Sequence, residues 1–544
     1  MQNKFNVYGK RTLLILFVVF SFLACIKCIF FGLNVDEEYA VTMAYRILGE
    51  DSMFYTMWEP HQTSGFLCAL LLKPFLAVNG GGTDYMVIYL RTMGILIHAG
   101  VCTYVYFGLK HICSRYEAFL LSLLCFSILP KWTLIPEFSN ILLWVTLCMM
   151  ACFLQIQHAR VFRVGWFLFL GILTCVGVLA YPSFLLCFIV YAIGICYVVS
   201  DRRKTALAVY VITCAGIGIC YLVFFAGSLG IDVFLKGIFQ MATDGQHATP
   251  FISKLADNSI ELVKCIGIYA VLYALACLLA KVLKKDVKRR AFLLLSMGAV
   301  LWQLLVWLGK SEYLYEPMTL FYHIFLVILM SCAMTRKEVL LYILPPVAAV
   351  LAAGALTNTG IYVISFFLLP AVVYGLARLA GQNRREVGIV MVALAGLFLF
   401  AKGWLLCEAV GYKADMFYVK QKALSGPAKN IYCRYLDGYE YNIVQELMDA
   451  YVEEDDNVLC VSGHTLWYLL ADVNISNFST ISTPTYDERL LEYYSEFPEK
   501  YPDVIILQEV SGYENVLELF ELEEPIAERE GIYLYFTSRH EGEE

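Results

Sequence analysis

Long apolar segments recur along the whole chain and are separated by short polar gaps. A helix needs about 20 apolar residues to cross a bilayer, so the pattern predicts about thirteen membrane helices, a few of them short enough to be tilted or re-entrant. We expect these helices at 12–33, 84–109, 117–132, 138–157, 164–180, 182–199, 205–226, 259–281, 291–309, 317–334, 338–356, 360–379 and 387–406.

A different pattern follows residue 406. Short apolar runs at 457–462, 503–508 and 532–536 predict strands, and periodic segments at 441–451 and 488–497 predict helices. The expected fold is therefore a polytopic α-helical membrane domain, residues 1–406, joined to a soluble α/β domain, residues 407–544.

The first polar gap is the most unusual stretch of the chain. It opens with the carboxylates Asp36, Glu37 and Glu38, and a helix is expected at 37–48. The segment 61–78 is apolar but contains Pro74, so we expect it to lie in the membrane interface rather than to span.

Basic clusters occupy every second gap, which the positive-inside rule places on the cytoplasmic side. The N-terminus is then cytoplasmic, while the loops 34–83 and 227–258 and the C-terminal domain are extracytoplasmic. These outer segments are long and carry carboxylates, His and Tyr, so function is expected to face outward.

Composition agrees with a multi-pass membrane protein: 60% of the 544 residues are hydrophobic and 16% are charged. From Cys407 onward there are 28 acidic and 9 basic residues. Such an acidic segment argues against a nucleic-acid partner.

Several ionisable residues at outer helix ends have two interpretations each. Asp36 and Glu37 either stabilise a helix start or supply a general base. Glu137, between two expected spans, either faces a cavity or caps a helix beside Lys131. Arg91 and Lys310 either bind a lipid phosphate or pair with a carboxylate.

Glu59, His61 and His247 form a looser set. His and Glu together can hold a divalent metal ion, whereas a single His is more often a polar residue with its hydrogen bonds satisfied. Their separation along the chain leaves both interpretations open.

At these residues the chain resembles the GT-C glycosyltransferases of the group that contains protein O-mannosyltransferases and the lipid A aminoarabinose transferase. These enzymes transfer a sugar from a polyprenyl-phosphate carrier outside the membrane. Asp36-Glu37 is similar to the Asp-Glu pair after the family's first helix, Arg91 to its phosphate-binding Arg, and Glu137 to its second acidic residue.

A further match is Gln246-His247-Ala-Thr-Pro250-Phe251, which resembles a Gln-His-x-x-Pro-Phe segment of the aminoarabinose transferase. By that resemblance His247 and Glu59 would hold a zinc-like divalent metal. The family's Lys and Tyr-x-x-Pro segment is only partly kept: Tyr313 and Tyr315 flank the expected tyrosine position between Lys310 and Pro317.

Pro60 stands where the family often has a Lys, and either His61 or Lys73 replaces it or no residue does. The resemblance implies catalysis by Asp36, Glu37 and Glu137, and donor-phosphate binding by Arg91, Lys310, Tyr313, Tyr315 and His61. Attack from the face opposite the phosphate would invert the anomeric centre.

The implied partners are a lipid-linked sugar donor and a glycan, lipid or protein acceptor. The alternative function is a transporter or flippase of a lipid-linked or small polar substrate; it predicts mid-membrane ionisable residues and inverted repeats. A bacterial plasma membrane is favoured, since the C-terminal segment resembles no endoplasmic reticulum member. The sequence leaves the sugar, the acceptor and the oligomeric state open.

Overall fold

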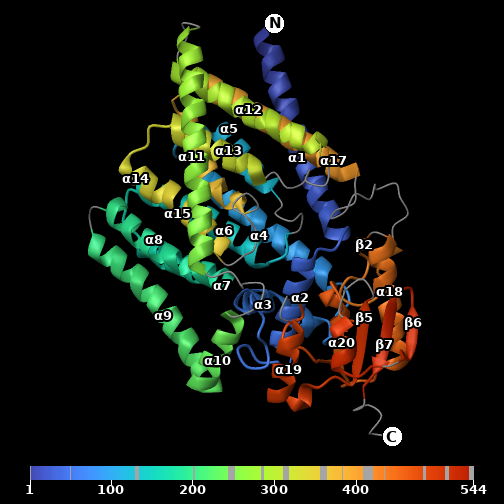
Figure 1. Ribbon diagram of the computed structural model, residues 1–544. Coiled ribbons are helices and arrows are strands. Elements are labelled where there is room, and N and C mark those ends of the chain that lie inside the picture. The colour runs from blue at the N-terminus through green and yellow to red at the C-terminus, as the bar shows by residue number, and fades with distance from the viewer. Residues whose placement is uncertain are drawn as a thin grey trace.

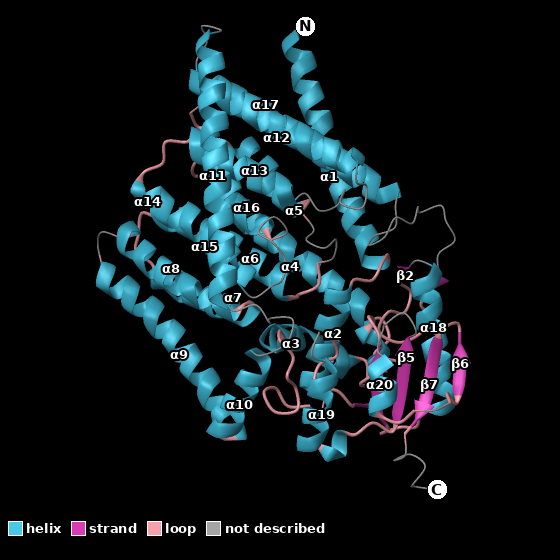
Figure 2. Cartoon of the chain, in the orientation of Figure 1, coloured by secondary structure: helices cyan, strands magenta, loops and turns pink. Residues whose placement is uncertain are grey.

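The computed structural model is largely helical, with one sheet-containing region near its C-terminus. Helix α1 begins at one end of the helical bundle, and the five-stranded sheet lies at the opposite end (Figures 1 and 2). The structure describes residues 2–49, 51–128, 134–199, 202–242, 251–282, 287–309, 318–355, 364–382, 384–407, 421–433, 435–481, 486–508, 514–522 and 524–537.

Eight helices in the described part of the chain are long and apolar enough to cross a membrane, which supports a multi-pass membrane protein. They lie in α1 (Gln2–Phe30), α4 (Met86–Leu109), α6 (Phe138–His158), α9 (Arg203–Leu229), α11 (Phe251–Val282), α12 (Val287–Gly309), the continuous run of α14 (Arg336–Glu338), η5 (Val339–Ile343) and α15 (Leu344–Ala355), and α17 (Arg384–Cys407).

The other expected spans are helical but shorter. At about 1.5 Å per residue, helices of this length fall short of the roughly 30 Å hydrocarbon layer. They are α5 (Arg115–Phe126), α7 (Val164–Ala180), α8 (Leu185–Val198) after η2 (Pro182–Phe184), α13 (Met318–Ser331), and α16 (Leu369–Ala380) after η6 (Ser365–Leu368). The count of about thirteen spans and the orientation therefore stay predictions.

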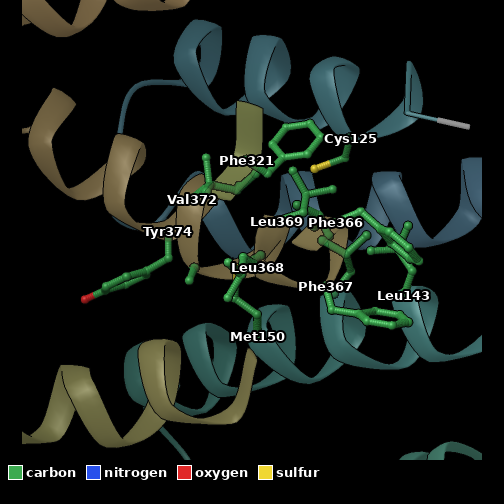
Figure 3. Close-up of a cluster of buried hydrophobic side chains, with 14 of the residues drawn as sticks. Cys125, Leu143, Met150, Phe321, Phe366, Phe367, Leu368, Leu369, Val372 and Tyr374 are labelled. Carbon is green, nitrogen blue, oxygen red and sulfur yellow. The ribbon is translucent and has the colours of Figure 1, made fainter. Parts of the chain in front are cut away.

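Burial separates a central helix from peripheral ones. In α6, 89% of the apolar window is buried, compared with 6% in α9 and 11% in α11. Apolar side chains of α5, α13, η6 and α16 pack against those of α6 (Figure 3). The long apolar surfaces that α9 and α11 expose are of the kind that faces lipid in a membrane protein.

The first polar gap forms two helices, α2 (Val35–Leu48) and α3 (Gln62–Val78), the second with Pro74 inside it. Gly94 of α4 fixes where the segment between α5 and α6 passes. A Cβ atom at Gly94 would lie 1.4 Å from the carbonyl oxygen of Leu134, so only glycine permits this contact. The segment that leads to Glu137 therefore crosses α4 one turn from Arg91.

The C-terminal sheet region, residues 421–537, contains helices α18 (Tyr435–Tyr451), α19 (Tyr486–Glu496) and α20 (Glu514–Leu519), with short turns η7 (Thr465–Leu469) and η8 (Pro498–Lys500). Its five-stranded sheet has the order β4-β3-β5-β7-β6. The strands are β3 (Asn457–Val461), β4 (Asn474–Ile475), β5 (Val504–Gln508), β6 (Ala527–Arg529) and β7 (Ile532–Phe536).

Strand β3 pairs in parallel with β4 and β5, and Leu459 lies opposite Ile505. Strand β7 runs antiparallel between β5 and β6. A two-stranded sheet, β1 (Gln421–Lys422) with β2 (Tyr432–Cys433), precedes α18. The structure thus confirms the three strands and two helices that the sequence predicts here, and adds the short strands.

The first polar gap and the C-terminal sheet region share hydrophobic cores. One core joins Val41 and Ala44 of α2 and Leu72 of α3 to Val444 and Leu466. In another, Trp58 packs among side chains of α19, β3 and β5. Helix α10 (Ile231–Ala242) covers the first gap so closely that a Cβ atom at Gly237 would lie 1.9 Å from the carbonyl oxygen of Phe54.

Candidate functional site

Helix α2 begins with three consecutive carboxylates after a capping residue. Asn34 accepts a hydrogen bond from the backbone N–H of Asp36 at 3.0 Å, as an N-cap does. The three acidic side chains then diverge: Asp36 is half-buried, while Glu37 and Glu38 are buried. Their charges favour the helix start in all three cases, so their surroundings decide what else they do.

Glu37 forms a buried, bidentate ion pair with Arg91 of α4. The Nε atom of Arg91 donates to Oε1 at 2.6 Å, and Nη2 donates to Oε2 at 2.5 Å. Because both oxygens accept from one rigid guanidinium, the carboxylate is held in a single orientation. This pair brings together two residues that the sequence analysis singles out.

Arg91 also closes the end of α1. Its Nη1 donates to the carbonyl oxygens of Cys28 and Ile29 at 2.9 and 3.2 Å, and its Nη2 donates to that of Gly32 at 2.6 Å. The carbonyls of Cys28 and Ile29 are among those that a helix C-terminus leaves without partners. Arg91 therefore positions Glu37 and α1 here; the expectation that it binds a donor phosphate stays a prediction.

Glu137 caps α6. Its carboxylate accepts from the backbone N–H groups of Ser139 at 2.8 Å and Asn140 at 2.7 Å, so its charge lies at the positive end of the most buried of the eight membrane-length helices. The side chain is buried. The geometry is therefore that of a helix cap, one of the two interpretations that the sequence left open. A catalytic role for Glu137 stays a prediction.

His61 precedes α3 and lies beside this cap. Its ring stacks on Phe138 with centroids 4.2 Å apart, and the edge of Tyr181 meets it at 6.0 Å. The Tyr181 hydroxyl lies 3.3 Å from the Oγ atom of Ser139. The structure therefore gathers His61, Glu137 and Tyr181 where α3, α6 and α7 meet.

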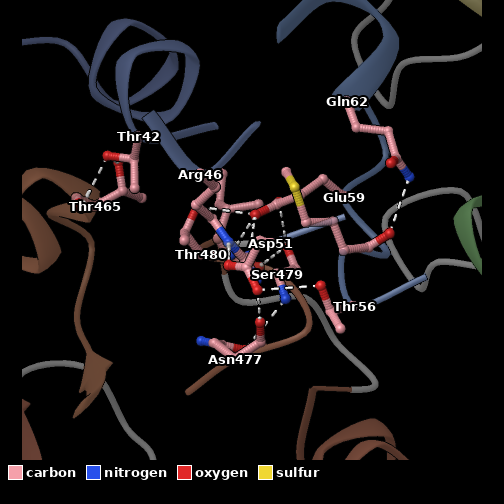
Figure 4. Close-up of polar contacts among 12 residues, drawn as sticks. Thr42, Arg46, Asp51, Thr56, Glu59, Gln62, Thr465, Asn477, Ser479 and Thr480 are labelled. Carbon is pink, nitrogen blue, oxygen red and sulfur yellow. Dashed lines mark hydrogen bonds and ion pairs between the residues drawn. The ribbon is translucent and has the colours of Figure 1, made fainter. Parts of the chain in front are cut away.

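Glu59 is fully buried and lies in a second polar cluster. Its Oε1 accepts from Arg46 Nη1 at 2.9 Å and from the Thr480 backbone N–H at 2.9 Å, and its Oε2 accepts from the Ser479 hydroxyl at 2.9 Å (Figure 4). We call this cluster the Arg46 network; it consists of Arg46, Asp51, Glu59, Ser479 and Thr480.

Arg46 and Asp51 complete the network. Arg46 Nε donates to Asp51 at 2.7 Å, and Lys500 lies 3.1 Å from the other Asp51 oxygen. Burial alone would raise the pKa of Asp51, but the charges of Arg46 and Lys500 outweigh it and lower that pKa. Burial would likewise lower the pKa of Arg46, and Asp51 and Glu59 raise it instead.

The residues described around Glu59 do not fit a metal ion. Both its oxygens accept hydrogen bonds from protein groups, and no metal-binding group of His, Cys, Asp and Glu occurs within the described ranges. The proposed partner His247 lies outside those ranges, as do Lys310, Tyr313 and Tyr315. We derive no chemical step through a metal at this position.

Two further groups were not singled out by the sequence analysis. Arg46 is buried inside the AYRIL run of α2, and a charged residue within an apolar helix face was the available signal. His464 lies 3.3 Å from Glu38, although 426 positions separate them along the chain. No local pattern announces a contact of that kind.

A scan against protein-family models and a search of curated proteins found no match. Among solved structures, the chain is similar to the Archaeoglobus fulgidus oligosaccharyltransferase in complex with Zn and sulfate, with a TM-score of 0.42 and 10% identity, over 94% of this chain and 70% of that chain. Another is the archaeal oligosaccharyltransferase AglB from Archaeoglobus fulgidus in complex with an inhibitory peptide and a dolichol-phosphate, with a TM-score of 0.39, 11% identity and coverage of 92% and 70%.

Both TM-scores lie below 0.5, so these likenesses carry no argument about this chain. Their superposition on this chain is loose, and about nine residues in ten differ. We therefore transfer no residue role from them, and the proposals below rest on the residues of this chain.

Proposed function

We propose that the chain is a membrane glycosyltransferase that moves a sugar from a polyprenyl-phosphate carrier to an acceptor at the outer face of the membrane. The observation that supports it most is the arrangement at the start of α2. Asp36 is half-buried beside Glu37, whose charge Arg91 neutralises at the end of the first membrane helix. A fixed ion pair next to a partly accessible carboxylate suits chemistry at a membrane surface.

Asp36 is the general base of this proposal. Glu37 has both oxygens occupied by Arg91, so it is poorly placed to take a proton from an acceptor. Arg91 offsets the charge of Glu37, and Asp36 beside this pair would orient or deprotonate an acceptor hydroxyl or amine. Glu37 then fixes the helix start on which Asp36 is held.

Glu137 and His61 form the second wall of the proposed site. Backbone N–H groups hold Glu137 in one orientation, and the stacked Phe138 ring holds His61. The segment that carries Glu137 crosses α4 at Gly94, one turn from Arg91. In the proposal, Glu137 positions the acceptor and His61 assists in holding the donor phosphate.

The departing polyprenyl phosphate gains negative charge, which cationic and hydroxyl groups would stabilise. Lys310, Tyr313 and Tyr315 are proposed for this part from their sequence context. Arg91 would join them only by releasing carbonyl groups of α1, because protein acceptors occupy its N–H groups. Attack by the acceptor opposite the phosphate would invert the anomeric centre.

The test is to supply purified protein with polyprenyl-phosphate sugars and a panel of acceptors, and to measure released polyprenyl phosphate. Asp36→Asn should reduce release by about 10² to 10⁴-fold, the usual contribution of a general base. Asp232→Asn is a matched control, because Asp232 is also the second residue of a helix, α10, and is exposed.

Unchanged release by Asp36→Asn would remove Asp36 from the mechanism. Movement of labelled donor into proteoliposomes, without release of polyprenyl phosphate under any acceptor, would favour the transporter instead.

A further inference from the structure

The parallel part of the C-terminal sheet contains a switch in strand order. The chain passes from β3 to β4 on one side, and then returns across β3 to β5 on the other. The first connection, η7, packs with Val458 and Cys460, and α19 of the second packs with Leu459 and Val461 on the opposite face. In open α/β sheets, ligands bind at the carboxyl ends of strands where the order reverses in this way.

Polar side chains gather at this edge of the sheet. After β3, the backbone N–H of His464 donates to the Ser462 hydroxyl at 3.0 Å. At the end of β5, Gln508 donates to Glu440 of α18 at 3.0 Å, and the Nε2 atom of His464 lies 3.8 Å from the same Glu440 oxygen. The chain opens to solvent here, because Gly463 is exposed and a Cβ atom there would contact nothing within 4 Å.

Helix α2 supplies the remaining wall. The Thr42 hydroxyl donates to the carbonyl oxygen of Thr465 at 3.0 Å, which fixes α2 against the loop after β3. One turn earlier on the same helix face, Oε1 of Glu38 lies 3.3 Å from Nδ1 of His464. Glu38, from the first polar gap, therefore lies at the edge of the C-terminal sheet, beside a residue 426 positions further along the chain.

Glu38 is incompletely satisfied in this position. It is 1% exposed, and its Oε2 atom has no hydrogen-bond partner among the residues that the structure describes. A buried carboxylate oxygen without a donor is costly, so such an atom marks a place where a ligand can supply one. This distinguishes the cluster from the Arg46 network, where both oxygens of Glu59 accept hydrogen bonds.

The donor that fits best is a primary ammonium group. An ammonium group offers three N–H donors and no acceptor, and hydrogen bonds between charged groups are about twice as strong as neutral ones. A metal ion is a poorer match, because Glu38, His464 and Glu440 do not form a metal-binding group within the described ranges. A neutral hydroxyl would leave the carboxylate charges uncompensated.

We infer that Glu38, Glu440 and His464 bind the ammonium group of an amine-bearing acceptor. That the ligand is an acceptor rests on the proposed function. That it carries an ammonium group rests on the geometry of these three residues alone. Asp36 and Glu38 lie two residues apart and project from different sides of α2, so the acceptor must extend around the helix start. We therefore expect its ammonium group and its attacking atom to be separated by several bonds.

The experiment measures binding by the full-length protein in detergent at pH 7.5, by thermal unfolding and calorimetry. Glucosamine and glucose are the probes, since they differ in one group. Glucosamine should raise the midpoint of unfolding and glucose should not, as expected for a ligand of the folded state. Glu38→Gln should weaken glucosamine binding by at least about tenfold, the effect of losing roughly 1.4 kcal/mol. Glu446→Gln, an exposed position of α18, is the control and should bind as the wild type does.

Equal binding of glucose and glucosamine, or full glucosamine binding by Glu38→Gln, would overturn the inference. Stabilisation by calcium with none by glucosamine would overturn it in favour of a cation site. If Glu38→Gln fails to fold, Glu440→Gln takes its place with the same expected weakening. Asp36→Asn should lose transfer and keep glucosamine binding, so failure of the proposed function and failure of this inference give different results.

Discussion

Two clusters of charged side chains in the first polar gap differ in how their charges are satisfied. In the Arg46 network, both oxygens of Glu59 accept hydrogen bonds from Arg46, Ser479 and Thr480. At the start of α2, Asp36 is half-buried and one oxygen of Glu38 has no partner in the described part of the chain.

This difference separates structural charges from functional ones. A buried network whose members are all satisfied fixes one arrangement of the chain, whereas a partly satisfied one is stable only if something else completes it. The Arg46 network attaches the first gap to the C-terminal sheet region. The start of α2 is the better candidate for contact with substrates.

The largest expected effect comes from breaking the satisfied network. Glu59→Gln would leave Arg46 buried with one anionic partner fewer, so the free energy of unfolding should fall by about 3–5 kcal/mol. The transfer rate per folded molecule should stay unchanged. Denaturant unfolding in detergent measures the first quantity, and release of polyprenyl phosphate measures the second.

Glu446→Gln serves as the control for this change too, because its exposed ion pair with Arg529 contributes little to stability. A Glu59→Gln protein with wild-type stability but no transfer, or one that loses a bound metal ion, would restore the metal-ligand role predicted from the sequence.

A smaller effect is expected at Arg91, which holds Glu37 beside the proposed general base Asp36. Arg91→Lys keeps the positive charge but cannot hold Glu37 in a bidentate pair, so Asp36 would be less well positioned. We expect kcat to fall by about tenfold to a hundredfold, with the KM for the donor little changed. Steady-state kinetics with varied donor concentration separates the two constants.

A raised donor KM with an unchanged kcat would instead show that Arg91 contacts the donor phosphate. In that case the hydrogen bonds to the end of α1 would have to open during binding.

The smallest expected effect concerns pH. The pKa of Asp51 is lowered from its ordinary value of 3.8, so its ion pairs stabilise the fold fully above about pH 4 and progressively less as the pH falls through the lowered pKa. Asp51→Asn should be less stable than the wild type at pH 7, and the difference should shrink toward pH 3. Unfolding midpoints of both proteins across this range provide the measurement.

A difference that is constant from pH 7 to pH 3 would show that Asp51 acts through packing and neutral hydrogen bonds. The Thr56 hydroxyl, which donates to Asp51 at 3.1 Å, is the group that such a result would point to.

Much of the fold was predictable because its signals are local. Strands β3, β5 and β7 fall on the short apolar runs, and α2 begins within two residues of its expected start. The ends of some membrane helices were less predictable: α5 ends at Phe126 and α13 at Ser331, before the expected ends at 132 and 334, whereas α7 covers the expected residues 164–180. Tertiary packing supplies most of a helix's stability, so apolar content alone does not set its end.

The sequence by itself determined where the apolar helices and strands form and which short segments carry clustered carboxylates, because periodicity and charge are properties of neighbouring residues. Only the tertiary structure decided which carboxylates are satisfied. Thr480 donates to Glu59 across 421 positions, Arg91 pairs with Glu37 across 54, and His464 approaches Glu38 across 426. A hydrogen bond depends on the positions of two atoms in space, and residues so far apart in the chain acquire those positions only when it folds.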